Sequence, residues 1–250
     1  MIYRVIKLYE SISRWYQYIF PAQQGQLKFF KDKFINLGVS SVLDVACGTG
    51  EYTSAFARWG LHSVGVDLDQ TMIEEAKKKT TSSKIEADFV RADMTDLPFN
   101  GDYFDACICI GNSFVHLLQE EQHLQALRDM YRVLKPGGVL LLQTVNYDRI
   151  LRDKVLQLPK IFNEDVGLTF ERSYSFRDDG LIDFRTVLRV PGGNNEKRVI
   201  ENTVPLYPLT LDELLVSMEK VGFFPIKPWS GFSSSPWDIK AFATVVEAYK

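Results

Sequence analysis

The stretch Val42-Leu43-Asp44-Val45-Ala46-Cys47-Gly48-Thr49-Gly50 has the residue types and the spacing of a ligand-binding turn. Its apolar first half predicts a short strand at 41–45, and the residues after Gly50 predict a helix through Trp59. A strand that leads through a Gly-x-Gly turn into a helix lets the backbone approach a ligand closely. A Gly-x-Gly pair alone also fits a plain strand-to-helix turn.

An acidic residue, Asp67, ends the next predicted strand at 62–66. A carboxylate in that place can accept hydrogen bonds from ribose hydroxyls, as it does in dinucleotide-binding folds. The glycine turn and the acid at this separation together predict a nucleoside site. A dehydrogenase fingerprint has a further glycine in the turn, at the position of Thr53 in this chain, which disfavours a dehydrogenase.

A third polar position, Asp93-Met94, follows the predicted strand at 89–92. An acid beside an apolar residue suits an adenine, because Asp93 can face the exocyclic amine while Met94 covers the ring. Asp93 fits equally well as a cap or as a solvated loop residue, and the sequence alone leaves both interpretations open.

A run of alternating elements must position these residues. Apolar runs predict strands at 41–45, 62–66, 89–92, 104–110 and 139–143, and amphipathic stretches predict helices between them, including 71–79 and 120–134. The run at 104–110 is apolar on both faces, as expected of a buried strand. We interpret the pattern as five βα repeats of a doubly wound α/β sheet with right-handed crossovers.

The segments on either side of this core have their own patterns. Two amphipathic helices, the first ended by Pro21 and the second at about 23–37, form either a cap over the site or a plain packing pair. Strands predicted at 168–176, 181–190 and 198–206, with turns at 178–180 and 192–194, indicate an antiparallel insertion laid against the sheet. A helix at 210–221 follows, with Thr210 as N-cap and Gly222 as stop, and then strands at 224–229 and 239–248.

The composition excludes several classes of protein. The chain has 250 residues, 29 Lys and Arg against 32 Asp and Glu, and 46% apolar residues, which is typical of a globular protein. A pI of about 5.7 disfavours a broad nucleic-acid-binding surface. Three cysteines without a CxxC pair disfavour disulfides and a zinc ribbon, and no metal cluster stands out. No apolar run is long enough to span a membrane, and charges interrupt the first twenty residues, so we expect a cytoplasmic protein.

Taken together, VLDVACGTG, Asp67, Asp93-Met94, FDACICIGNS and LKPGG resemble a class I S-adenosylmethionine-dependent methyltransferase. Gly111-Asn112-Ser113-Phe114 with His116-Leu117, and then Asn146-Tyr147-Asp148, are similar to the glycine N-methyltransferase and glycine/sarcosine methyltransferase group. Weaker matches at 207–208 and 231–232 extend the resemblance to nearly the whole chain. It implies a single methyltransferase domain with a Rossmann-like seven-stranded sheet: a helical cap at 1–37, a cofactor-binding core at 38–150, an insertion or lid at 151–208, and a last helix with two strands at 209–250.

The resemblance also implies roles for individual residues toward S-adenosylmethionine. The methionine end of the cofactor would meet Asp44, Ala46, Gly48, Thr49 and Gly50. The ribose would meet Asp67 and Leu68, and the adenine Asp93 and Met94. The carbonyl of Ile110 would lie near the cofactor, and Asn112 and Ser113 where the methyl donor meets the acceptor. A tyrosine of the N-terminal segment reaches into such sites, and Tyr16 and Tyr18 are the candidates here.

Two positions depart from the group's pattern. Glycine methyltransferases carry an Arg before Asn-Tyr-Asp that holds the acceptor's carboxylate, and this chain has Val145 there. A tyrosine of the insertion that lines the acceptor site corresponds to Phe184. Asn112, Val145, Asn146, Phe184 and Tyr207 are therefore the implied neighbours of the acceptor. Because a desolvated carboxylate would lack its bidentate partner, we expect an acceptor that is larger, less polar or uncharged at that end.

We predict a small-molecule methyltransferase with an amine as the favoured acceptor, without nucleic acid or membrane as partner; whether it forms a homo-oligomer is left open. Methylation of RNA or protein is disfavoured because the sequence shows no basic stripe or appended binding domain. A non-catalytic adenosyl-nucleoside binder is the other alternative. His116 fits a general base and a structural hydrogen-bonding residue equally well, and the alternating Cys107 and Cys109 are expected to pack as small hydrophobes.

Overall fold

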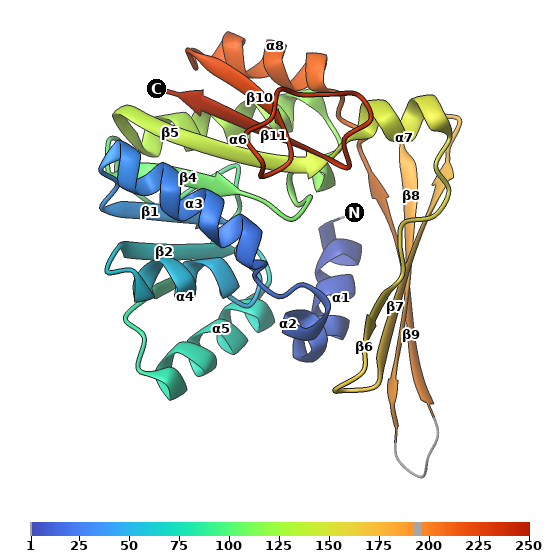
Figure 1. Cartoon of the computed structure of the whole chain (residues 1–250). Coiled ribbons are helices and arrows are strands. Elements are labelled where there is room, and N and C mark those ends of the chain that lie inside the picture. Colours follow the sequence, from blue (N-terminus) through green and yellow to red (C-terminus); the bar gives the residue numbers. More distant parts are fainter. Residues whose placement is uncertain (1, 193–196) are drawn as a thin grey trace.

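A seven-stranded sheet forms the centre of the computed structural model, which describes residues 2–192 and 197–250 (Figure 1). The strand order is β10-β11-β5-β4-β1-β2-β3. Its strands are β1 (Ser41–Val45), β2 (His62–Asp67), β3 (Asp88–Arg91), β4 (Phe104–Cys109), β5 (Leu134–Val145), β10 (Ile226–Ser230) and β11 (Ala243–Tyr249). The first five pair in parallel, and β11 runs antiparallel between β5 and β10. The predicted doubly wound α/β fold is confirmed.

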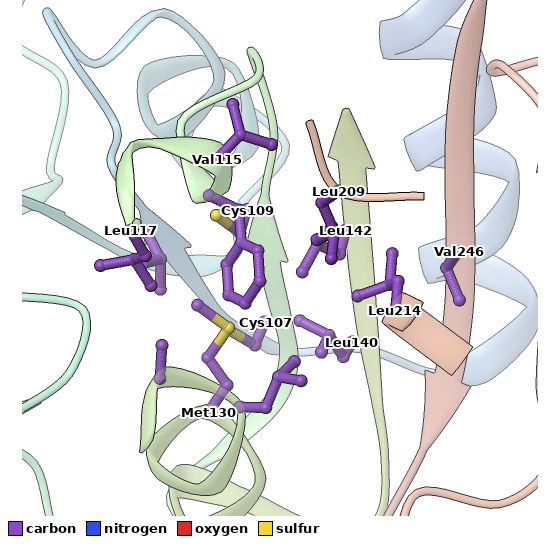
Figure 2. Packing of buried hydrophobic residues seen from close by; sticks show 14 of the residues in the cluster. Cys107, Cys109, Val115, Leu117, Met130, Leu140, Leu142, Leu209, Leu214 and Val246 are labelled. Atoms are coloured by element: carbon purple, nitrogen blue, oxygen red, sulfur yellow. The ribbon is translucent and has the colours of Figure 1, made fainter. Parts of the chain in front are cut away.

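Helices cover both faces of this sheet because the central strands are apolar on both sides. They are α3 (Gln24–Leu37), α4 (Glu51–Arg58), α5 (Gln70–Ser83), α6 (Glu120–Val133), α7 (Tyr147–Asp153) and α8 (Leu211–Val221). On one face an aromatic cluster of Phe30, Phe34 and Phe56 packs on β1 and β4. On the other face Cys107 and Cys109 are fully buried among aliphatic and aromatic side chains, as expected of small hydrophobes (Figure 2).

Three features of the core differ from the expectation. The segment 92–103 between β3 and β4 holds no helix, so the prediction of five complete βα repeats is wrong at that point. An isolated bridge between Asp93 and Asp96 turns the chain there instead. β5 begins at Leu134 and not at Val139, because Leu134 pairs with Phe104 across a register shift in β4. The helix expected at 71–79 extends to Ser83, where Lys84 in the left-handed region ends it.

The insertion forms a separate antiparallel sheet in the order β6-β7-β8-β9. Its strands are β6 (Ile161–Asn163), β7 (Leu168–Phe176), β8 (Ile182–Pro191) and β9 (Lys197–Leu206), of which β6 was not predicted. The predicted turn at 192–194 falls mostly outside the described residues. Figure 1 shows this sheet standing beside the seven-stranded sheet, with N-terminal helices between them. Its residues Tyr174, Ile182 and Leu206 belong to the same hydrophobic cluster as the large sheet, so the expectation that it lies against that sheet holds for this part of the insertion only.

The helices between the two sheets are α1 (Ile2–Ile12) and α2 (Tyr16–Ile19), joined by a short 3-10 turn. Ile12 and Ile19 are buried against Phe170 and Leu188 of the insertion sheet. The helical stripe seen in the sequence is therefore divided: Ile12 and Ile19 face the insertion, whereas Val5, Ile6 and Tyr9 line a cavity beside the large sheet.

The last part of the chain follows the predicted pattern closely. Thr210 caps α8: its hydroxyl accepts from the Glu213 N–H, and the Glu213 carboxylate accepts from the Thr210 N–H, a complete capping box. Gly222 ends the helix in the left-handed region. Among the described residues no helix is long and apolar enough to cross a membrane.

Candidate active site

The turn between β1 and α4 is built from residues in the left-handed region. Ala46, Gly48 and Gly50 have φ values of 61°, 55° and 73°. Gly50 has no room for a side chain, because a Cβ there would lie 2.6 Å from a ring carbon of Phe89. Ala46 adopts this conformation although it carries a Cβ, which costs about 1 kcal/mol. Such strain is common where a backbone is shaped for a ligand.

Asp67 at the end of β2 ties this turn to the neighbouring strand. One carboxylate oxygen accepts from the Gly48 N–H at 2.9 Å, and the other accepts from the Asp69 N–H at 2.9 Å. Burial raises the pKa of Asp67 to about 6, although these hydrogen bonds oppose the rise. Each oxygen keeps a further lone pair, so the carboxylate can still accept from a ligand hydroxyl.

Asp44 is the second buried acid, within β1. Its carboxylate accepts from the Thr53 hydroxyl at 2.6 Å, and burial raises its pKa to about 7. This contact explains why a threonine and not a glycine occupies position 53.

A first cavity of about 430 Å³ extends from the glycine turn along the ends of β2 and β3. The predicted residues Asp67, Leu68, Asp93, Met94 and Ser113 line it together. Asp93 caps its own loop, because one carboxylate oxygen accepts from the N–H and the hydroxyl of Thr95. Among the residues that the structure describes, none donates a hydrogen bond to its other oxygen, so the two roles proposed for this residue are compatible.

A second cavity of about 550 Å³ lies between the glycine turn, the N-terminal helices and the insertion sheet. Of the predicted residues, it is lined by Asp44, Ala46, Ile110, Asn112, Val145, Phe184, Tyr16 and Tyr18. The apolar Val145 side chain, in place of the group's arginine, therefore lies at the cavity wall.

Tyr9, Tyr16, Ala46 and His116 line both cavities and mark their junction. Tyr16 lies over the glycine turn, since a Cβ on Gly48 would come 2.9 Å from its ring. The Tyr9 hydroxyl forms a 2.8 Å hydrogen bond with Nε2 of His116. Burial lowers the pKa of His116 to about 4, and its Nδ1 is buried without a partner. Sequence reasoning missed Tyr9, although it lies on the same helical stripe as Tyr16.

Asn112 follows β4 with a left-handed φ of 69°. Its side-chain oxygen accepts from the Val145 N–H at 2.9 Å, and its amide donates to the Tyr147 hydroxyl at 3.0 Å. The side chain thus ties the ends of β4 and β5 together while it lines the second cavity. Nearby, the Ser113 hydroxyl donates to the Ile110 carbonyl at 3.3 Å.

Four of the predicted residues line neither cavity: Thr49, Gly50, Asn146 and Tyr207. Asn146 is fully buried as the N-cap of α7, and its amide donates to the carbonyls of Ile239 and Ala241. The Tyr207 hydroxyl donates to Glu213, and its ring packs on His123. Both side chains are engaged in holding the fold, so we correct the expectation that they contact the acceptor.

The insertion contributes cavity residues that sequence reasoning did not single out. Arg172 and Tyr174 of β7 and Thr186 of β8 line the second cavity beside Phe184. The sequence shows that these residues alternate along the strands. Which face of the sheet is turned toward the cavity depends on how the insertion packs on α1 and α2. Among the described residues no group of three or more His, Cys, Asp or Glu is arranged to hold a metal ion.

Comparisons with known proteins agree with this geometry. Residues 42–138 match the methyltransferase domain family. The chain is 36% identical over 162 residues to a glycine/sarcosine N-methyltransferase of Parasynechococcus marenigrum, and the match covers 62% of this chain but only 56% of that enzyme. It is 30% identical over 209 residues to a glycine/sarcosine N-methyltransferase of Aphanothece halophytica, covering 83% of this chain and 75% of that enzyme.

A solved structure shares the whole fold. An S-adenosylmethionine-dependent methyltransferase from Clostridium acetobutylicum superimposes with a TM-score of 0.80 at 16% identity, covering 97% of this chain and 98% of that chain. The 30% identity over three quarters of a relative's length and the matched domain together show the family. The chain belongs to the class I S-adenosylmethionine-dependent methyltransferases, in the group of the glycine and glycine/sarcosine N-methyltransferases.

Proposed function

We propose that the protein transfers a methyl group from S-adenosylmethionine to an amine nitrogen of a small molecule. The observation that carries this proposal is the pair of cavities that meet at Tyr9, Tyr16 and His116. One cavity presents the residues expected around an adenosyl group, and the other offers space for an acceptor. In-line transfer needs donor and acceptor held end to end, and two joined cavities provide that arrangement.

The first cavity fits the cofactor's chemistry. Asp67 retains acceptor capacity for ribose hydroxyls, Asp93 has a carboxylate oxygen without a protein partner, and Met94 offers an apolar surface to the base. When bound, S-adenosylmethionine supplies a methyl group on a sulfonium, which is activated for displacement without a covalent enzyme intermediate. The protein's contribution is then to position the donor and to exclude water.

The acceptor must present a free lone pair, and His116 is poorly suited to create one. Its pKa of about 4 lies roughly six units below that of an alkylammonium, so the proton transfer would cost about 8 kcal/mol. We infer that the amine binds as the free base, having lost its proton to the bulk buffer before it enters the cavity. His116 then acts as the hydrogen-bonding partner that orients Tyr9.

The size and the lining of the second cavity favour a small acceptor other than glycine. The relatives described above are named for glycine and sarcosine. In this chain Val145 lines the cavity where the group has an arginine, so a carboxylate at that point would lose its water without gaining a countercharge. Glycine, the smallest amino acid, would also fill only a small part of about 550 Å³.

The test is the release of S-adenosylhomocysteine across a panel of primary and secondary amines, amino acids, phenols and carboxylates. We expect turnover with amines and little with glycine, sarcosine, phenols or carboxylic acids. The Asp67→Asn variant keeps the shape of the side chain but removes its charge. It serves as the control, because turnover that depends on the cofactor should fall in this variant. Binding of S-adenosylmethionine by calorimetry without turnover of any amine would contradict the proposed activity.

A further inference from the structure

We propose that Arg172 binds an anionic group of the acceptor, a carboxylate that lies at the far end of the molecule from the methylated amine. This inference rests on the proposed function, because it names a property of the same acceptor. It places the anion-binding residue on the insertion sheet and not at the end of β5, where Val145 stands.

The register of the insertion sheet points Arg172 toward the second cavity. Arg172 pairs with Thr186, and Tyr174 pairs with Phe184, across β7 and β8. Residues two apart on a strand share a face, and cross-strand partners share it too. All four side chains line the second cavity, so this face of the sheet is one wall of the cavity.

Three other arginines of the insertion are paired with carboxylates, whereas Arg172 is not. Arg189 pairs with Glu171 at 2.7 Å, Arg185 with Glu201 at 2.8 Å, and Arg177 with Asp179 at 2.6 Å. Arg172 makes no such pair within the described residues. Its guanidinium donates one hydrogen bond, to the Pro159 carbonyl at 2.9 Å, and its Nε is buried without a partner.

A half-buried guanidinium without a countercharge is costly, and burial lowers the pKa of Arg172 accordingly. An anion supplied by a ligand would offset this cost. A planar carboxylate matches the fork of a guanidinium and would restore both the charge balance and the missing hydrogen bonds.

The position of Arg172 sets the direction of the acceptor. Arg172 lines the cavity on the insertion sheet, whereas on the side of the glycine turn burial raises the pKa of Asp44 to about 7 and Lys79 pairs with Glu51. An acceptor with a neutral amine at one end and a carboxylate at the other fits this arrangement. The amine would then lie toward the junction with the first cavity, where the donor is expected.

The experiment compares ω-amino carboxylates of increasing chain length with their ω-amino carboxamides, which are of equal size but neutral at that end. The variants are Arg172→Gln and, as a matched control, Arg189→Gln, which removes an arginine from the outer, carboxylate-paired side of the same sheet. Turnover is followed by release of S-adenosylhomocysteine, and donor affinity by calorimetry.

For the unmodified protein we expect a preference for ω-amino carboxylates that are longer than glycine. Their kcat/KM should exceed that of the matching carboxamides by about tenfold or more. Arg172→Gln should abolish that preference, mainly by raising KM for the carboxylate about 10–100-fold. Arg189→Gln should leave the preference intact. Affinity for S-adenosylmethionine should stay within about twofold in both variants.

An equal loss of kcat/KM on carboxylates and carboxamides in Arg172→Gln would overturn the proposal. Weaker binding of S-adenosylmethionine by this variant would also overturn it, because Arg172 would then support the donor site or the fold. If no amine is methylated, the proposed function fails, and Arg172 is then judged by binding alone. In that case, calorimetry measures binding of the carboxylate to the protein loaded with S-adenosylhomocysteine. Binding by the unmodified protein that is lost in Arg172→Gln supports the anion site. Binding that persists in the variant overturns it.

Discussion

The hydroxyl of Tyr9 lies 2.8 Å from Nε2 of His116, across a sequence separation of 107 residues. The rings also meet edge to face, with centroids 5.6 Å apart. This contact fixes α1 to the loop after β4 at the place where the two cavities join. The N-terminal helix is thereby part of the wall that separates the site from solvent.

Removing this hydrogen bond should loosen the wall. In Tyr9→Phe, His116 would have no partner for either ring nitrogen, and we expect a loss of about 1–3 kcal/mol in the free energy of unfolding. We also expect a several-fold lower kcat/KM, because water would enter the junction. Urea unfolding and steady-state kinetics measure both effects. Tyr103→Phe is the control, since Tyr103 is exposed and lines neither cavity; equal effects of the two variants would contradict a special role for Tyr9.

Loss of the Asp67 carboxylate should weaken the cofactor site specifically. We expect Asp67→Ala to weaken the binding free energy for S-adenosylmethionine by about 1–3 kcal/mol, the cost of a charge-assisted hydrogen bond, which raises the dissociation constant about 5–150-fold. Asp67→Asn should lose less, because its amide oxygen can still accept from the Gly48 N–H. Calorimetry distinguishes the three proteins. If a folded Asp67→Ala variant bound the donor with unchanged affinity, the assignment of Asp67 to the ribose would be wrong.

Gly48 should tolerate no side chain, for a reason beyond its backbone angle. The new Cβ of Gly48→Ala would lie 2.9 Å from a carbon of the Tyr16 ring, so Tyr16 must shift. Gly60→Ala is a matched control, because Gly60 also has a positive φ but has open space around it. We expect both variants to lose about 1–2 kcal/mol of stability from strain. Only Gly48→Ala should also lose donor affinity in a calorimetric titration; similar affinity in both would mean that the turn is only a connector.

The raised pKa of Asp44 makes the stability of the cofactor-free protein depend on pH. Its folded pKa is about 7 against an ordinary value of 3.8, so the folded state favours the protonated acid. This contribution is fully present below pH 3.8 and is lost as the pH rises through about 7. From pH 5 to pH 8 the free energy of unfolding loses about 2–3 kcal/mol of this contribution.

The measurement compares urea unfolding of the cofactor-free protein with that of Asp44→Asn, which can still accept from Thr53. The free energy of unfolding of the unmodified protein should fall by that amount, relative to that of Asp44→Asn, when the pH is raised from 5 to 8. His116, whose pKa is lowered, acts in the opposite direction below pH 6.5 but is common to both proteins. A difference that does not change with pH would show that Asp44 is ionised throughout.

The Val145→Arg variant tests why glycine is expected to be a poor acceptor. A guanidinium at that position would line the second cavity and give a short amino acid its countercharge. We expect glycine turnover to rise about tenfold or more above that of the unmodified protein. Val145→Leu controls for size alone. Fast methylation of glycine by the unmodified protein would show that Val145 does not limit the acceptor.

The sequence predicts the residues that line the first cavity better than those that line the second. Asp67, Asp93 and the glycine turn sit at strand ends, and the strand periodicity of the core places them without knowledge of tertiary contacts. Arg172 and Thr186 come together only because two long strands pair in one register and turn one face inward. Asn146 and Tyr207 match a motif and yet hold loops and helices together, which no local pattern reveals.

The insertion leaves and rejoins the core at neighbouring points. β5 ends at Val145, paired with Ala243 of β11, and the Tyr207 N–H that follows β9 donates to the Val115 carbonyl beside the end of β4. Its length and sequence can therefore vary while the seven-stranded sheet keeps its pairing. The part of the second cavity's wall that the insertion forms can therefore be replaced while the core keeps its strand pairing. A chimera that carries a relative's segment at 151–208 should change the acceptor preference that this wall sets, while the effect of Val145 and the donor affinity stay those of the parent.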